Sequence, residues 1–504
     1  MTAMDTAKDA APLGTRWNLR EQIGVQRELL TILLSEPRFR TLMLALWLSD
    51  FGSSIHRPVI TFFFLQLGAT VMDIGYLSFF MGTASMILSP IYGWMVDSRG
   101  VLKPLLLSAL SCGFGCLIRA IASTPVHLIT AQLFMGIGGS CQWSMVKGYI
   151  ASELPHSKRA LLVVGLRAQM TLLTLGSFLY PALDSGLQLL GFADKLLRYR
   201  AEVGTCAIFC WVGIVILIAG CSTAGRPSDP KPQRHVEQSV SRCSFDFLVA
   251  AGTLSLVSCC QSACRTLWPI YIKFHFGWEA RSFAFLSSTN TLLFSIALAM
   301  YPSWTQRMSQ RQVLQGLAWL SLLTLFGFCV GARQQSLGLP HLLHVFLGVP
   351  SLVFVGVLTS GIEIAASLCV PADAQGWAMG LLNSAQAAGG VAGSLLGPAL
   401  WTISISEVAD VSAPSLVGVL LSEGRLPFVV TAAALLLCVM LLQCPLWQRA
   451  EHTAQPGNST TIDMVPIGCA TEDLGFDDPE NAKGHRQANE DENLPLNEEN
   501  SKVC

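Results

Sequence analysis

The feature that most constrains this chain is a long series of apolar stretches, each of about 20 residues, separated by short polar turns. Stretches of that length predict membrane-spanning helices, because a helix satisfies its backbone hydrogen bonds without water. Hydrophobic residues fill 52% of the 504 positions and charged residues only 13%, which argues against a soluble multidomain protein. We therefore predict an all-α polytopic membrane protein with twelve transmembrane helices. The expected spans are 41–65, 73–94, 104–123, 127–150, 160–183, 203–222, 246–272, 281–302, 313–332, 341–369, 377–402 and 426–447.

The two halves of the chain repeat each other. Pro90 and Val101 flank a charged turn after the second span, and Pro302 and Val313 recur at the same offset after the eighth span. Repeats of this kind build two helix bundles that move around a site between them. The twelve helices are therefore expected to form two pseudo-symmetric six-helix bundles, an arrangement typical of a transporter rather than of a receptor or an enzyme.

Shifts in composition divide the chain into five parts. Lysine and arginine are concentrated on one set of turns, which places both termini in the cytoplasm without distinguishing the plasma membrane from an organelle. A linker rich in Pro, Ser, Arg and Gln separates the bundles, and the acidic C-terminal segment has the composition of a disordered tail. The predicted parts are a cytoplasmic N-terminal segment (1–40), the first bundle (41–222), a cytoplasmic linker (223–245), the second bundle (246–447) and a disordered acidic cytoplasmic tail (448–504).

The charged turn after the second span carries a recognisable motif, made by Gly93, Asp97, Gly100 and Lys103. These residues resemble the signature of the major facilitator superfamily between its second and third spans, although Ser98 stands where that family usually has arginine. The resemblance covers residues 41–447. It implies that the turn locks the outward-facing state, with the Asp97 carboxylate near helix N-termini across the bundle interface. Anchoring by positive charges alone explains Lys103 but neither the aspartate nor the glycines.

The subfamily is not resolved by the remaining motifs. Gly389, Gly390 and Gly393 in span eleven resemble the tight helix packing of drug-efflux members of the family. However, span five lacks the Gly-Pro-x-x-Gly-Gly run of proton-driven drug antiporters, and Gln132 stands where many of them have arginine. The Pro-Glu-Ser-Pro-Arg run of sugar porters is absent after span six as well.

Charged side chains inside the spans are costly in lipid, so each one is a functional candidate. Polar residues follow helical spacing on one face of span one (Asp50, Ser54, Arg57 and Thr61) and on one face of span seven (Ser258, Gln261, Arg265 and Trp268). The family resemblance implies that spans one, four, seven and ten line a central cavity, and that both stripes face it. The predicted substrate-binding or coupling residues are Asp50, Arg57, Trp143, Gln261, Arg265 and Trp268, with the two tryptophans as stacking surfaces.

The role of Asp50 has two interpretations. It could carry a proton, because burial disfavours the charged form of a carboxylate. It could equally form a permanent ion pair with Arg57 or with another helix. A second charged pair, Lys147 in span four and Glu363 in span ten, is pseudo-symmetric and of opposite sign. We predict that this pair meets as an inner gate; the alternative is that both side chains snorkel to the interface.

The sixteen cysteines show no metal-binding spacing along the sequence. Three pairs are four residues apart and lie on one helix face each: Cys112 and Cys116, Cys206 and Cys210, and Cys260 and Cys264. Because no Cys-x-x-Cys or Cys/His cluster occurs, we interpret these residues as small apolar side chains. The sequence therefore predicts no metal site and no cofactor.

These features predict a membrane transporter that moves a small organic solute by alternating access, with proton coupling through Asp50 left open. The mixed charges suit a polar solute that is anionic or zwitterionic. The alternatives are a drug or xenobiotic efflux carrier and a non-transporting sensor or accessory protein with the same fold. No nucleotide loop, zinc site or activated nucleophile suggests an enzyme. The expected partners are the lipid bilayer, a small-molecule substrate and protons, with no nucleic acid, and the chain is expected to act as a monomer.

Overall fold

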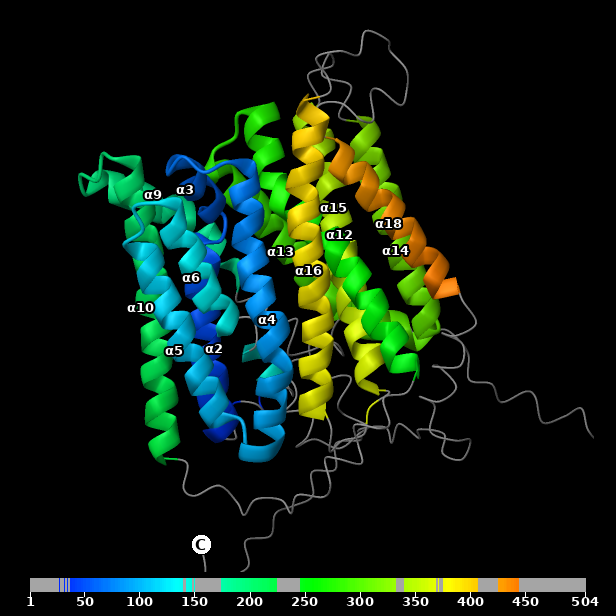
Figure 1. Cartoon of the computed structure of the whole chain (residues 1–504), viewed down its shortest axis with the longest axis horizontal. Helices are drawn as coiled ribbons and strands as arrows, with labels where there is room; N and C mark the ends of the chain where they lie inside the picture. The colour runs from blue at the N-terminus through cyan, green and yellow to red at the C-terminus, as the bar shows by residue number, and fades with distance from the viewer. Residues whose placement is uncertain are drawn as a thin grey trace, which may run out of the picture. The chain divides into compact units, whose positions relative to one another are not determined.

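The structure, a computed structural model, describes residues 37–138, 142–146, 174–223, 245–331, 340–368, 375–406 and 425–443, together with a few isolated positions. These residues form helices and connecting turns, without a strand among them (Figure 1). The helices of the first half are α2 (Pro37–His56), α3 (Ile60–Gln66), α4 (Val71–Arg99), α5 (Leu102–Ala120), α6 (Pro125–Ile137), the 3-10 turn η1 (Thr174–Phe178), α9 (Tyr180–Leu189) and α10 (Lys195–Thr223). Those of the second half are α12 (Phe245–Phe276), α13 (Ala280–Arg307), α14 (Gln310–Gly331), α15 (Pro340–Leu368), α16 (Gln375–Ser406) and α18 (Leu426–Gln443).

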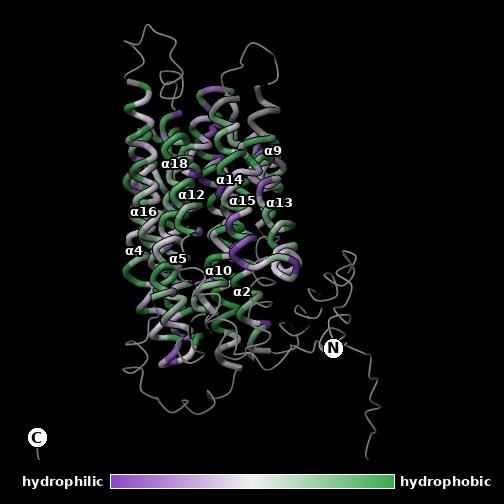
Figure 2. The backbone as a smooth tube through the Cα atoms, turned by 90° about the vertical axis from the view of Figure 1, so that its right-hand side faces the viewer, coloured by the Kyte–Doolittle hydropathy of each residue, from purple (hydrophilic) through white to green (hydrophobic). Residues whose placement is uncertain are grey.

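Within the described residues, nine helices are long and apolar enough to cross a membrane. Hydrophobic residues predominate along these helices (Figure 2). They confirm the all-α, multi-pass architecture, and α4 and α13 match predicted spans 73–94 and 281–302 with short extensions. The predicted count of twelve is tested only in part, because most of span 160–183 lies outside the described residues. The five-part division and the cytoplasmic placement of the termini stay predictions.

Span one departs from the expected continuous helix. Its two segments, α2 and α3, are separated by a turn at Arg57, Pro58 and Val59. Proline has no backbone N–H and its ring interferes with the preceding helical turn, which accounts for the interruption. The break matters for function because it lies in the middle of the predicted polar stripe.

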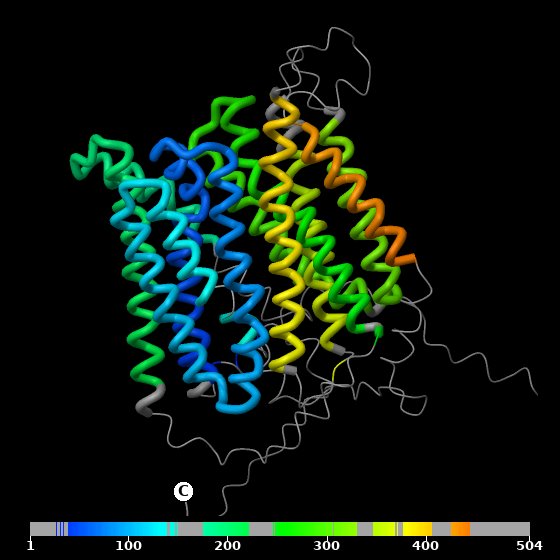
Figure 3. The backbone as a smooth tube through the Cα atoms, viewed as in Figure 1, coloured from blue at the N-terminus to red at the C-terminus, as the bar shows by residue number. Residues whose placement is uncertain are grey.

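The halves of the chain meet along a seam between α4 and α16, which run side by side (Figures 1 and 3). Hydrogen bonds cross this seam at 2.6 Å from Asn383 Nδ2 to Ser89 Oγ and at 2.5 Å from Ser384 Oγ to the Met86 carbonyl. The other side of α16 packs on α12, where Gly389 and Gly393 lie so close to the α12 backbone that a Cβ at either position would collide with it. The glycine run therefore permits close helix packing, as its sequence predicts.

Candidate functional site

Asp50 and Trp143, two residues predicted from separate spans, are in direct contact. The Trp143 indole Nε1–H donates a hydrogen bond of 2.7 Å to Asp50 Oδ2. Asp50 comes from α2, and Trp143 belongs to the helical segment 142–146; both side chains are half-buried. Because an indole N–H can only donate, it holds the carboxylate oxygen in one orientation and stabilises its negative charge.

Arg57 lies at the break between α2 and α3. Its backbone N–H donates to the Ser53 carbonyl at 3.2 Å, while its side chain is exposed between buried neighbours. The Arg57 charge is close enough to act electrostatically on Asp50. Among the described residues, however, the two do not form an ion pair within 4.0 Å, and the direct partner of the carboxylate is Trp143.

Arg265 on α12 approaches the same place from the second half of the chain. Its side chain is exposed, and its charge and that of Arg57 repel each other. Gln261, one helical turn earlier on α12, is half-buried on the same face. The Arg57 and Arg265 guanidinium groups, from opposite halves of the chain, thus lie near enough for their charges to interact, and the charge of Arg57 also acts on Asp50.

The other predicted site residues have different surroundings. Trp268 is buried, with 5% of its surface exposed, and packs edge-to-face on Phe283 with ring centroids 6.0 Å apart. Glu363 on α15 is buried as well, at 6% exposure. Lys147, its predicted gate partner, lies outside the described residues, so the inner gate stays a prediction.

The motif residues of the charged turn join α4 to α16. Near the end of α4, Asp97 Oδ2 accepts a hydrogen bond of 2.8 Å from the backbone N–H of Trp377, in the first turn of α16. One turn earlier, Gly93 lies directly against the Gly376 carbonyl, where a Cβ would collide. Gly100 ends α4 with φ of +78°, a conformation that favours glycine, and Lys103 is exposed in the first turn of α5.

A second set of contacts joins the halves through other elements, from η1 and the start of α10 to the N-terminal part of α13. Lys195 Nζ lies 2.9 Å from Glu279 Oε1, and the hydroxyls of Ser177 and Ser288 are 2.6 Å apart. Sequence reasoning missed these contacts. The sequence signal was a group of basic residues on a turn where few were expected. Such a group does not identify Glu279, 84 residues further along the chain, as the partner of Lys195.

Comparisons with known proteins place this geometry in context. The family model described as Major Facilitator Superfamily matches residues 42–258. No curated protein sequence matches the chain. Among solved structures, the fold is similar to that of the human organic anion transporter MFSD10 (TETRAN), with 14% identity, a TM-score of 0.52 and coverage of 83% of this chain and 99% of that one.

Two further solved structures share the fold. One is a bacterial homologue of the iron transporter ferroportin in the outward-facing state, with 13% identity, a TM-score of 0.56 and coverage of 81% of this chain and 98% of that one. The other is a variant of the nucleoside transporter NupG, with 10% identity, a TM-score of 0.57 and coverage of 81% and 99%. At these identities the likeness concerns the fold alone.

Proposed function

We propose that the chain is a membrane transporter of the major facilitator superfamily, as the family model matching residues 42–258 supports, and that it moves an anionic organic solute by alternating access. The proposal is supported by the electrostatic interaction between Arg57 and Arg265, which come from opposite halves of the chain. Two like charges inside a membrane protein are unfavourable unless a negative charge compensates them. Asp50 supplies one negative charge, which leaves the group with an excess positive charge.

An anion bound between the two arginines would relieve their repulsion. Each guanidinium presents a fork of N–H donors that matches the two oxygens of a carboxylate or the oxygens of a phosphate. A cation would increase the repulsion, and an uncharged apolar compound would leave it uncompensated. The charges therefore favour an anionic solute over the drug-efflux alternative, and MFSD10, which has a similar fold, is an organic anion transporter.

The positions of the contacts between the halves support alternating access. The Asp97–Trp377 hydrogen bond holds one end, and the Lys195–Glu279 pair holds the other. A solute bridging Arg57 and Arg265 would draw the halves together at the centre, so that either end can open while the other stays closed. Transport by this scheme requires each set of contacts to break in turn.

Proton coupling, where present, would act through Asp50. A proton on this carboxylate removes the negative charge beside Arg57 and so strengthens the attraction of the site for an anion. The Trp143 hydrogen bond opposes protonation, because the N–H donates more strongly to a charged oxygen. The two effects would link anion binding to proton binding, which is the behaviour of a proton–anion symporter.

The test is uptake by proteoliposomes that contain the purified chain, offered a pooled metabolite mixture with and without a pH gradient and read by mass spectrometry. We expect the lumen to gain one class of organic anion, with uptake lost in Arg57→Gln and in Arg265→Gln. Arg281→Gln, which removes an exposed arginine at the start of α13, is the matched control and should transport normally. Uptake only of cations or neutral solutes would overturn the anionic assignment.

A non-transporting sensor would behave differently in the same experiment. It would bind an anion, seen as a rise in melting temperature that Arg265→Gln removes, yet no solute would enter the vesicles. That result would contradict transport while retaining the anion site.

A further inference from the structure

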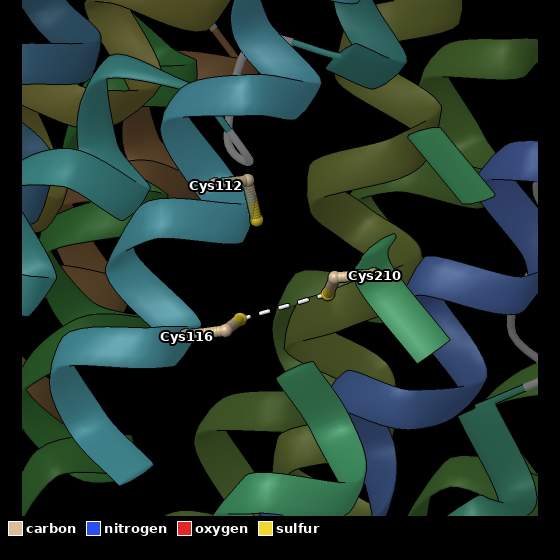
Figure 4. A group of neighbouring side chains, drawn as sticks. All are labelled: Cys112, Cys116 and Cys210. Atoms are coloured by element: carbon tan, nitrogen blue, oxygen red, sulfur yellow. Dashed lines mark hydrogen bonds between the residues drawn. The ribbon is translucent and has the colours of Figure 1, made fainter. Parts of the chain in front are cut away.

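Four cysteines from two neighbouring helices converge inside the first half of the chain. Cys112 and Cys116 lie one turn apart on α5, and Cys206 and Cys210 lie one turn apart on α10. All four are buried, with at most 3% of their surface exposed. In Figure 4, Cys112 and Cys116 face Cys210 across the gap between the helices. The two pairs, separated by 90 residues in sequence, therefore form one sulfur cluster, which we call the four-cysteine cluster.

The distances in this cluster match those of a metal centre. Cys116 Sγ lies 3.7 Å from Cys206 Sγ and 3.5 Å from Cys210 Sγ. The sulfurs of Cys112, Cys116 and Cys210 all lie within 4.8 Å of one another. A tetrahedral ion with metal–sulfur bonds of about 2.3 Å places its sulfurs about 3.8 Å apart. Cys206, which is not part of this group of three, would have to turn its Sγ toward Cys112 and Cys210 to complete such a centre.

We propose that Cys112, Cys116, Cys206 and Cys210 bind one Zn²⁺ ion as a closed tetrathiolate site. Four sulfur ligands in a tetrahedral arrangement favour zinc, and a site with four protein ligands leaves no position for a reacting water. The ion would therefore be structural. It would join α5 to α10 within the first half of the chain while the two halves move against each other.

The surroundings of the cluster suit thiolate ligands. Ser49 Oγ lies 3.4 Å from Cys210 Sγ, and Ser53 Oγ lies 3.9 Å from Cys206 Sγ. Both serines come from one face of α2. The Ser49 hydroxyl can donate to Cys210 Sγ, as groups around metal ligands commonly do, whereas the Cys206 thiol donates to Ser53 Oγ. Met135 and Ala207 pack against the four cysteines as apolar neighbours.

A nearby positive charge would offset the negative charge of a zinc tetrathiolate. Arg119 follows Cys116 by three residues on α5 and is 3% exposed. Its Nη1 lies 2.7 Å from His56 Nε2. Its position near the end of a predicted span suggests an interfacial anchor, yet the structure buries it beside the cluster. A buried charge needs such compensation.

The other pair of regularly spaced cysteines behaves differently. Cys260 and Cys264 have the same spacing on α12, but Cys260 Sγ donates to the Thr431 carbonyl at 3.8 Å and does not join a four-sulfur group. Within the described part of the chain, Cys112, Cys116 and Cys210 are the one group of three or more metal-ligating side chains at these distances. A four-residue spacing of cysteines on one helix is therefore not enough to form such a cluster. The cluster forms because α5 and α10 face each other.

The first test is the metal content of the full-length purified chain, measured by elemental mass spectrometry. We expect about one zinc per chain in the wild type, reduced on the order of tenfold or more in Cys116→Ser/Cys210→Ser. The matched control, Cys260→Ser/Cys264→Ser, has the same two changes at the same spacing and should keep its zinc. Absence of zinc from the wild type, or equal loss in both variants, would overturn the proposal.

The second test applies to the wild type, so that it does not depend on a variant that folds. Replacement of the ion by Co²⁺ should produce thiolate charge-transfer bands and the intense visible bands of a tetrahedral centre. Added Zn²⁺ should abolish these bands, and a chelator should lower the melting temperature. One copper per chain in place of zinc would overturn the assignment. A disulfide between Cys116 and either Cys206 or Cys210, found by peptide mapping, would overturn it as well.

Discussion

Asp97 accepts a hydrogen bond of 2.8 Å from the backbone N–H of Trp377, a residue 280 positions away in the sequence. The carboxylate lies near the end of α4, and the N–H belongs to the first turn of α16. A helix N-terminus carries unsatisfied N–H groups and a partial positive charge, so a carboxylate there is favourable. One side chain therefore joins the two halves of the chain at this end, and its effect on conformation can be measured.

Asp97→Asn should weaken this end contact without removing all hydrogen bonding. A carboxylate at a helix N-terminus contributes about 0.3–1 kcal/mol, so the closed population should fall roughly two- to fivefold. Spin labels at Lys103 and Met308, both exposed at this end, would report the opening as a longer distance. Asp73→Asn, a change at the capping residue of the other end of α4, is the control and should leave that distance unchanged.

Gly93→Ala should have a larger effect on the same seam. A Cβ at Gly93 would collide with the Gly376 carbonyl, which is backbone and cannot rotate away. Overpacking of this kind costs about 1–3 kcal/mol, and here the cost falls on the closed arrangement of α4 and α16. We expect slower transport and a longer distance between the same labels. Gly252→Ala, which has open space at its Cβ position, should change neither measurement.

The pair of Lys195 and Glu279 should contribute less to closure of the opposite end. Its nitrogen–oxygen distance is 2.9 Å, but the two side chains are 36% and 72% exposed, so water and salt screen the attraction. Glu279→Gln should change the transport rate by no more than a few-fold, and the difference should shrink at high salt. The charge-swapped pair, Lys195→Glu with Glu279→Lys, should transport better than either single variant. Equal loss in all three would contradict a direct role of the pair.

Hydropathy predicted the helices well because their length and composition are set locally by the bilayer. The contacts between helices could not be read in the same way. The spacing of Cys112 and Cys116 places them on one face of α5, but it does not reveal that α10 turns Cys206 and Cys210 toward that face. The expectation of no metal site rested on the spacing of cysteines along single helices. That criterion does not detect a site whose ligands come from two helices.

The polar stripe of span one illustrates the same limit. Helical spacing singled out Asp50 and Arg57 as candidates and suggested that they pair with each other. The structure gives Asp50 a partner from another helix, Trp143, and it interrupts the helix at Arg57. An isolated sequence cannot rank these partners, because their distances depend on how three helices pack.

The predicted gate between Lys147 and Glu363 can be tested by charge exchange. Glu363 is buried at 6% exposure, so an unpaired charge at this position would be costly. Lys147→Glu and Glu363→Lys should each reduce transport strongly, by about tenfold or more for a lost buried pair. The double variant should recover part of the activity. If the double variant is folded in detergent but does not recover transport, snorkelling of the two side chains is favoured.

Asp50 provides the test of coupling, and the direction of the effect follows from charge. Protonation of Asp50 removes the negative charge that interacts with Arg57, so anion binding should strengthen as the pH falls. Uptake by the wild type should therefore rise with decreasing pH outside the vesicle, and a pH gradient should drive accumulation. Asp50→Asn imitates the protonated state and keeps an oxygen that can accept the Trp143 hydrogen bond, so it should bind the anion at all pH values without using the gradient. Gradient-driven accumulation that survives in Asp50→Asn would show that another group carries the proton, while wild-type uptake indifferent to pH would identify a facilitator.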